Sequence, residues 1–173
     1  TVAIGVAMKQ LSGLDRLDAT AIAKLAQAAE CDFVGMRCGI MDQLISARGE
    51  AGHALLIDCR SLECQAVPLP PEAAILIVHS GIERGLVKGE YNARRTQCED
   101  AVRVLGVPAL RDATPAMLAA AGDCLSPLAL KRARHVVTEN ARTEAAAGAL
   151  ARGDLVTLGQ LMAQSHASMR DDF

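Results

Sequence analysis

Two carboxylates beside a glycine-containing segment are the side chains whose types and spacing best suit catalysis. Helical spacing of apolar residues places Glu30 at the end of one predicted helix and Asp42 in the first turn of the next. A tight connection between these helices would direct both carboxylates into one cleft, where they suit a divalent cation and a proton acceptor. A Glu that ends a helix and an Asp that begins one are more often solvated or capping groups. The pattern alone therefore favours the solvated or capping interpretation over a catalytic one.

The elements that position the two carboxylates follow from caps and periodicity. Asp18 is a good N-cap for a helix over 19–30, and a second helix begins at residue 40 and stops before Gly49. Residues 31–39, which include two glycines, are expected to form a loop. Because the helix dipole and free backbone N–H groups favour a negative charge in the first turn, we expect Asp42 to stay ionised at neutral pH.

Short apolar runs predict strands in the middle of the chain. Residues 53–58 and 64–69 are expected to pair as a hairpin, and the Pro-rich stretch 68–71 is the best linker. The continuous apolar run 73–78 predicts a strand buried in a sheet.

The rest of the sequence is mainly helical. A charged helix is expected over 90–105, and three further helices start at Thr114, Ser126 and Asp154. A helix over 1–11 begins without an N-cap, and the last helix has no stop signal. We therefore expect the chain to belong to a longer polypeptide.

Composition excludes several classes of function. The 173 residues are 51% hydrophobic and 2% aromatic, and 18 basic against 20 acidic side chains give a net charge of −2. Neither a positive field nor stacking platforms for nucleic acid are expected. No apolar run has the length of a membrane span, and the N-terminal residues lack the pattern of a signal peptide. The six cysteines contain no Cys-x-x-Cys pair, so we interpret them as reduced, intracellular, small buried hydrophobes.

Common site motifs are absent, including the P-loop, the dinucleotide-binding glycine pattern and the zinc-protease motif. The histidines receive no role as a base, since a lone helical His is more often a surface or satisfied core residue. The basic residues at 94–95 and 131–134 are interpreted as solvated helix faces.

Two specific motifs in the sequence favour the catalytic interpretation of Glu30 and Asp42. Cys38-Gly-Ile-Met-Asp-Gln43 and Ser165-His-Ala-Ser-Met-Arg-Asp-Asp-Phe173 resemble segments of galactokinases, which are sugar 1-kinases of the GHMP kinase superfamily. The resemblance is colinear over nearly the whole chain and continues through 53–62, 90–99, 109–112, 131–135 and 138–142.

The resemblance implies an activity and three site residues. Asp42 would sit against the anomeric hydroxyl of galactose as catalytic and substrate-binding residue, and the Tyr91 hydroxyl would contact the sugar. Glu30 would help to hold Mg²⁺ against the phosphates of ATP, the co-substrate. The expected reaction is ATP-dependent phosphorylation of α-D-galactose at its 1-hydroxyl in the cytoplasm, the entry step of the Leloir pathway. Phosphoryl transfer suits these residue types, because it needs positioning and charge neutralisation.

The resemblance also has gaps. The N-terminal sugar-binding stretch, the Gly/Ser-rich phosphate loop and the C-terminal glycine-rich block of galactokinases have no counterpart in this sequence. We therefore expect an α/β chain, the truncated middle of a two-domain GHMP-kinase-type fold with mixed sheet strands, inactive by itself. Residues 1–70 would end the N-terminal domain and 71–173 would begin the C-terminal one. Two alternatives stay open: a non-catalytic sugar and ATP sensor, and a relative acting on another sugar such as N-acetylgalactosamine.

Overall fold

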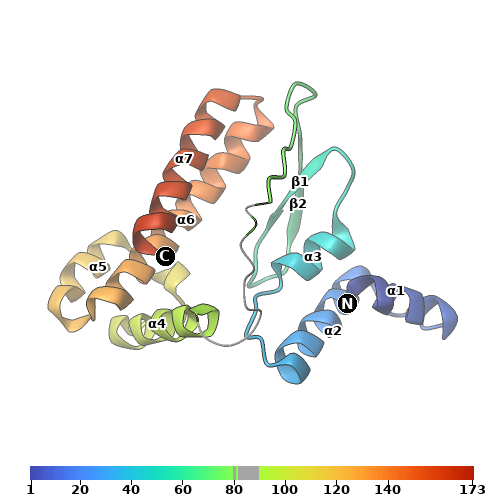
Figure 1. The fold of residues 1–173 in the computed structure, drawn as a ribbon, viewed down its shortest axis with the longest axis horizontal. Coiled ribbons are helices and arrows are strands. Elements are labelled where there is room, and N and C mark those ends of the chain that lie inside the picture. Colours follow the sequence, from blue (N-terminus) through green and yellow to red (C-terminus); the bar gives the residue numbers. More distant parts are fainter. Residues whose placement is uncertain (80, 82–89) are drawn as a thin grey trace. The chain divides into compact units, whose positions relative to one another are not determined.

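Residues 1–87 and 88–173 form two separate units in the computed structural model, which describes residues 1–79, 81 and 90–173 (Figure 1). The domain boundary that the Pro-rich stretch indicates at residue 70 stays a prediction.

Helices make up most of the first unit. They are α1 (Val2–Leu11), α2 (Ala19–Ala28), the π-helical turn η1 (Ala29–Val34) and α3 (Met41–Arg48). The carboxylate of Asp18 accepts a 2.6 Å hydrogen bond from the backbone N–H of Ala21, which confirms the predicted cap. Ala23 on α2 packs against Ile40 and Leu44, so α2 and α3 share one small buried core.

The end of the second helix differs from the prediction. The backbone continues beyond Ala28 as the π-helical turn η1, where a loop was expected from residue 31. Gly35 ends the turn with φ of 79°, a left-handed conformation that a glycine adopts without steric cost. The N–H of Met36 reaches back to the carbonyl of Glu30 at 3.1 Å. Glu30 therefore lies inside a π-helical turn, a distortion often found at functional sites.

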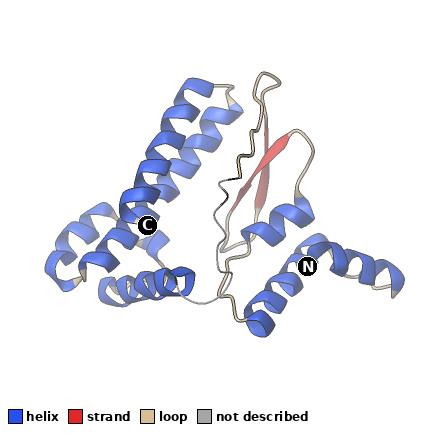
Figure 2. Ribbon diagram, viewed as in Figure 1, coloured by secondary structure: helices blue, strands red, loops and turns tan. Residues whose placement is uncertain are grey.

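A two-stranded antiparallel sheet completes the first unit (Figure 2). Strand β1 (His53–Ile57) pairs with β2 (Cys64–Pro68), with His53 opposite Pro68 and Ile57 opposite Cys64. The predicted hairpin is confirmed.

The prediction of a buried strand over 73–78 is wrong for this structure. These residues form neither helix nor strand, and Ile77 is 89% exposed. An apolar run becomes a buried strand only where neighbouring strands pair with it and helices cover it. No described residue pairs with it as a strand, since the described sheet contains only β1 and β2.

The second unit is helical within the residues described. Its elements are α4 (Glu90–Leu105), η2 (Leu110–Asp112), α5 (Pro115–Ala121), η3 (Gly122–Cys124), α6 (Pro127–Ala151) and α7 (Leu155–Asp172). Each predicted start is confirmed by a side-chain cap: Thr114 accepts from the Met117 N–H, Ser126 from the Ala129 N–H and Asp154 from the Thr157 N–H. Across the described part of the chain, no helix combines the length and apolar character that a membrane span requires.

The end of α7 packs onto α6 and α4. Arg132 stacks over the ring of Phe173, with its guanidinium carbon 5.6 Å from the ring centroid, and Arg94 lies 5.7 Å from it. Arg132 also donates to Gln97 Oε1 on α4 and to the Asp172 carbonyl, both at 2.8 Å. The interpretation of the basic run 131–134 as a solvated face is therefore wrong for Arg132, because its guanidinium makes tertiary contacts with Phe173, Gln97 and Asp172.

A buried histidine joins the two long helices. His135 on α6 is 5% exposed, and its Nδ1 lies 2.9 Å from Ser168 Oγ on α7. Burial lowers the pKa of His135, and the nearby Glu139 carboxylate acts in the opposite direction. His135 is thus a satisfied core residue, one of the two alternatives that the sequence left open.

We predict that Leu44→Ala destabilises the first unit by about 2–5 kcal/mol, because Leu44 is fully buried and its truncation leaves a cavity against α2. Urea unfolding followed by circular dichroism measures the change. The matched control is Leu25→Ala on α2, where the side chain is 59% exposed and a change within about 0.5 kcal/mol is expected. Equal losses in both variants would contradict the assigned core.

We predict that His135 makes the second unit less stable in acid. Since the folded pKa lies below the unfolded value of about 6.5, the stability it contributes is present above that pH and is lost as the pH falls through the folded pKa. Unfolding free energies measured between about pH 7 and pH 5 should decline less steeply in His135→Gln. His166→Gln, at an exposed position on α7, is the control; an identical slope in wild type and His135→Gln would refute the assignment.

Candidate functional site

Asp42 lies where the sequence predicts it, in the first turn of α3. Its side chain is exposed, whereas the two residues that follow, Gln43 and Leu44, are buried. Successive helical positions differ by about 100°, so burying Leu44 against α2 turns Asp42 outward. The carboxylate is therefore open to a ligand, beside free backbone N–H groups that favour an anion.

Glu30 is half-buried in η1. Its Oε1 accepts a 3.2 Å hydrogen bond from the Thr1 hydroxyl, and its Oε2 accepts a 3.7 Å bond from the thiol of Cys38. Both donors are neutral, and within the described residues no cationic group pairs with this carboxylate. The carboxylate oxygens of Glu30 therefore face no opposite charge among the described residues, and they could bind a cation.

Cys38 connects the elements that carry the two carboxylates. Its backbone carbonyl accepts a 3.2 Å bond from Gln27 Nε2 on α2, while its Sγ accepts a 3.9 Å contact from Gln43 Nε2 on α3. Its thiol donates to Glu30 on η1. The structure thus links Glu30 and the first turn of α3 through one cysteine, although it brings no hydrogen bond between Glu30 and Asp42 themselves.

The environment of Cys38 suppresses its ionisation. Burial raises the pKa of the Cys38 thiol to about 11, with further contributions from the neighbouring Cys31 and from the Glu30 carboxylate. The Oε1 atom of Gln43 is buried and has no hydrogen-bond partner among the described residues. A polar core of this kind beneath an exposed carboxylate fixes side-chain positions only when its members are paired.

Tyr91 begins the second unit's first helix. It lies in the first turn of α4 and is 48% exposed. The structure leaves its side chain accessible, as a residue that contacts a small ligand must be. Asp42 and Glu30 belong to the first unit and Tyr91 to the second.

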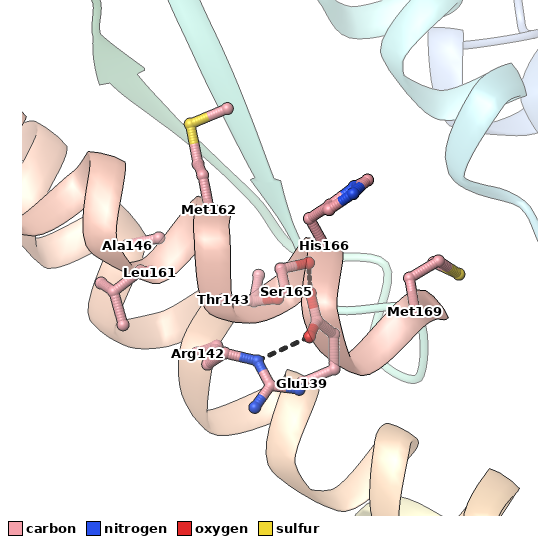
Figure 3. Close-up of a pocket in the computed structure, with 9 residues that line it drawn as sticks. All are labelled: Glu139, Arg142, Thr143, Ala146, Leu161, Met162, Ser165, His166 and Met169. Carbon is pink, nitrogen blue, oxygen red and sulfur yellow. Dashed lines mark hydrogen bonds and ion pairs between the residues drawn. The ribbon is translucent and has the colours of Figure 1, made fainter. Parts of the chain in front are cut away.

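A hollow of about 390 Å³ lies along α6 and α7 (Figure 3). At its base, Glu139 on α6 accepts hydrogen bonds from Ser165 on α7 and, at 2.7 Å, from Arg142 Nε. Burial acts to raise the pKa of Glu139, but these two hydrogen bonds, together with the nearby charges of Arg142 and His135, hold the pKa below its usual value. His166 and Met169 line the same hollow.

A second hollow of about 550 Å³ lies in the first unit, beside the hairpin. Arg48, Asp58 and Cys64 are among its lining residues. Neither hollow is lined by Asp42, Glu30 or Tyr91. These two hollows therefore do not mark the carboxylates that the sequence singles out.

A divalent cation fits Glu30 by the chemistry of its ligand atoms. Mg²⁺ prefers hard oxygen ligands and is commonly held by one or two carboxylates together with phosphate oxygens. No group of three or more acidic, His or Cys side chains gathers into a metal site among the described residues. Among the described residues, Glu30 would therefore bind such a cation without two further acidic, His or Cys ligands beside it.

None of the six cysteines forms a disulfide, but the expectation that they are buried is wrong. Cys59 and Cys124 are exposed, and the other four are half-buried. No sequence pattern indicates the contacts around Cys38, because they depend on the π-helical turn. The pairing of Glu139 with Ser165 was equally hidden, since it depends on how α6 packs against α7.

Two comparisons with known proteins agree with the resemblance to galactokinases that the sequence motifs indicate. Residues 1–50 match the family described as the GHMP kinases N terminal domain. The structure is similar to a galactokinase of Lactococcus lactis crystallised in complex with galactose, with a TM-score of 0.88 and 28% sequence identity. The match covers 99% of this chain and 45% of that protein, so the chain spans less than half the length of the galactokinase it resembles.

The family match includes Glu30 and Asp42, and the structural match extends over both units. The expected α/β fold is also confirmed, as a mainly helical chain with one small sheet. Residues 1–50 are thus similar to the N-terminal domain of GHMP kinases, and the chain as a whole has the fold of part of a galactokinase.

Proposed function

We propose that these residues form the central part of an ATP-dependent galactokinase, which transfers the γ-phosphoryl group of ATP to the 1-hydroxyl of α-D-galactose. The observation that carries the proposal is the structural match over nearly the whole chain to a galactokinase crystallised with galactose. The colinear sequence words around Asp42 and at the C-terminus support it independently.

Asp42 would act on the attacking hydroxyl. An exposed carboxylate at a helix N-terminus is an acceptor only, so it can orient the anomeric hydroxyl and accept its proton as the O–P bond forms. Holding the hydroxyl in line with the γ-phosphorus is the main catalytic need, because phosphoryl transfer demands little covalent help from the protein.

Tyr91 would supply a hydrogen bond to the sugar, and Glu30 would hold Mg²⁺. The bound cation neutralises charge on the phosphates during transfer. The half-buried carboxylate of Glu30, held by two neutral donors, is oriented for that task without being neutralised in advance.

The chain alone should not turn over. It spans less than half of the galactokinase it matches, and the resemblance offers no phosphate loop within these residues. Preorganised donors to the phosphates contribute orders of magnitude to rate, so the activity would belong to a complete enzyme that also supplies those segments. A cytoplasmic setting is part of the same proposal.

We predict that Asp42→Asn in the complete enzyme lowers kcat by about 100- to 10,000-fold, because the amide neither accepts the hydroxyl proton nor carries charge. The dissociation constant for galactose, measured by calorimetry, should change little, because the amide oxygen still accepts a hydrogen bond. The change therefore separates turnover from binding.

The matched control is Asp15→Asn, at an exposed position of the first unit, which should retain wild-type turnover. Wild-type turnover in Asp42→Asn would remove Asp42 from the mechanism. Galactose binding without turnover in the wild type would favour a non-catalytic sugar and ATP sensor. A preference for N-acetylgalactosamine would favour a relative that acts on another sugar.

We predict that Tyr91→Phe raises the KM for galactose by up to about tenfold, because it deletes one hydrogen bond worth about 0.5–1.5 kcal/mol. Because Tyr91 is half-exposed, we expect Tyr91→Phe and the wild type to have the same free energy of unfolding. Measuring both values is the internal control. Steady-state kinetics with galactose varied at saturating ATP gives the value. An unchanged KM and kcat would exclude a sugar contact at Tyr91.

A further inference from the structure

Two half-buried thiols lie in contact next to Glu30. The Sγ atoms of Cys31, in η1, and Cys38, in the loop before α3, are 3.9 Å apart. The Cys31 thiol also lies 3.7 Å from the backbone carbonyl of Cys38. A disulfide bond is about 2.0 Å long, so the two sulfur atoms need to approach by only about 2 Å.

The backbone between and beside the two cysteines can supply this movement. Gly35 adopts a left-handed conformation within the intervening segment, and Gly39 follows Cys38 directly. A Cβ added at either glycine would meet no atom within 4 Å, so neither is confined by neighbouring side chains. The partial exposure of both thiols admits a small oxidant.

We propose that Cys31 and Cys38 are a modification site that forms a reversible intrachain disulfide with a peroxide as oxidant. The S–H of Cys38 is engaged as a donor to Glu30, so we assign the first oxidation step to Cys31. The Cys31 sulfur takes one oxygen from hydrogen peroxide and becomes a sulfenic acid, and water leaves. The Cys38 sulfur then attacks it, so that the S–S bond forms, the S–O bond breaks, and the Cys38 proton departs with hydroxide as a second water. Two thiols lose two electrons, and the peroxide is reduced to two waters.

The disulfide would reach the candidate site through Glu30. Oxidation removes the Cys38 S–H donor, so Glu30 keeps only its bond from Thr1. It also ties η1 to the segment that leads into α3 and Asp42. This expectation rests on the proposed function of Glu30. We expect oxidation to lower kinase activity about 10- to 100-fold, because a metal ligand that loses its hydrogen-bond partner usually costs that much activity. A dithiol reductant should restore it.

Peptide mapping tests the site directly. Arg37 lies between the two cysteines, so trypsin separates them into peptides 25–37 and 38–48, each with one cysteine. After treatment of the complete enzyme with hydrogen peroxide and then alkylation, we expect these two peptides joined, with a mass lower by two hydrogen atoms than their sum. Reduction should release them.

Variants and controls make the result decisive. Cys31→Ser should abolish the joined peptide, and its activity should withstand peroxide, whereas Cys59→Ser, at an exposed cysteine, should retain both responses. Separate alkylated peptides after peroxide, or a dominant disulfide elsewhere, would overturn the site. A joined peptide with unchanged activity would overturn the link to Glu30. The mapping needs no catalysis, so an inactive reduced enzyme would count against the proposed function alone.

Discussion

The direction of Asp42 depends on the packing of Leu44 against α2. Leu44, Ile40 and Ala23 form a small core, and burying them fixes the rotation of α3 about its own axis. That rotation leaves Asp42 exposed at the helix N-terminus. The contacts of Cys38 with Gln27, Gln43 and Glu30 add a polar layer to the same junction. A loss of this core would misplace both carboxylates together.

The second unit places Tyr91 by a different kind of packing. Phe173 at the end of α7 lies beneath Arg94 on α4 and Arg132 on α6, and Arg132 also bonds to Gln97 on α4. The C-terminal motif 165–173 therefore has a structural role in this chain, because Phe173 helps to hold α4 against α6. Since α4 carries Tyr91 in its first turn, the same packing orients the proposed sugar contact.

Local signals in the sequence predicted most elements, and tertiary contacts explain the failures. Asp18, Thr114, Ser126 and Asp154 are caps whose partners lie three residues away, so sequence alone locates them. The run 73–78 was misjudged because burial of a strand depends on distant segments. Contacts across elements, such as those of Cys38 and Arg132, leave no periodic trace. Asp42, Glu30 and Tyr91 are predicted as site residues from the resemblance of their surrounding motifs to galactokinases. A carboxylate near a glycine is by itself too common to identify a site.

A galactose 1-kinase is defined by the hydroxyl that receives the phosphoryl group. The most direct measurement is phosphorus-31 NMR of the complete enzyme mixed with ATP, Mg²⁺ and α-D-galactose. We predict ADP together with a new phosphate resonance coupled to the anomeric proton of the sugar, which identifies galactose 1-phosphate. Phosphorylation at another hydroxyl, or ATP left intact with galactose bound, would contradict the assignment of this chain to a galactose 1-kinase.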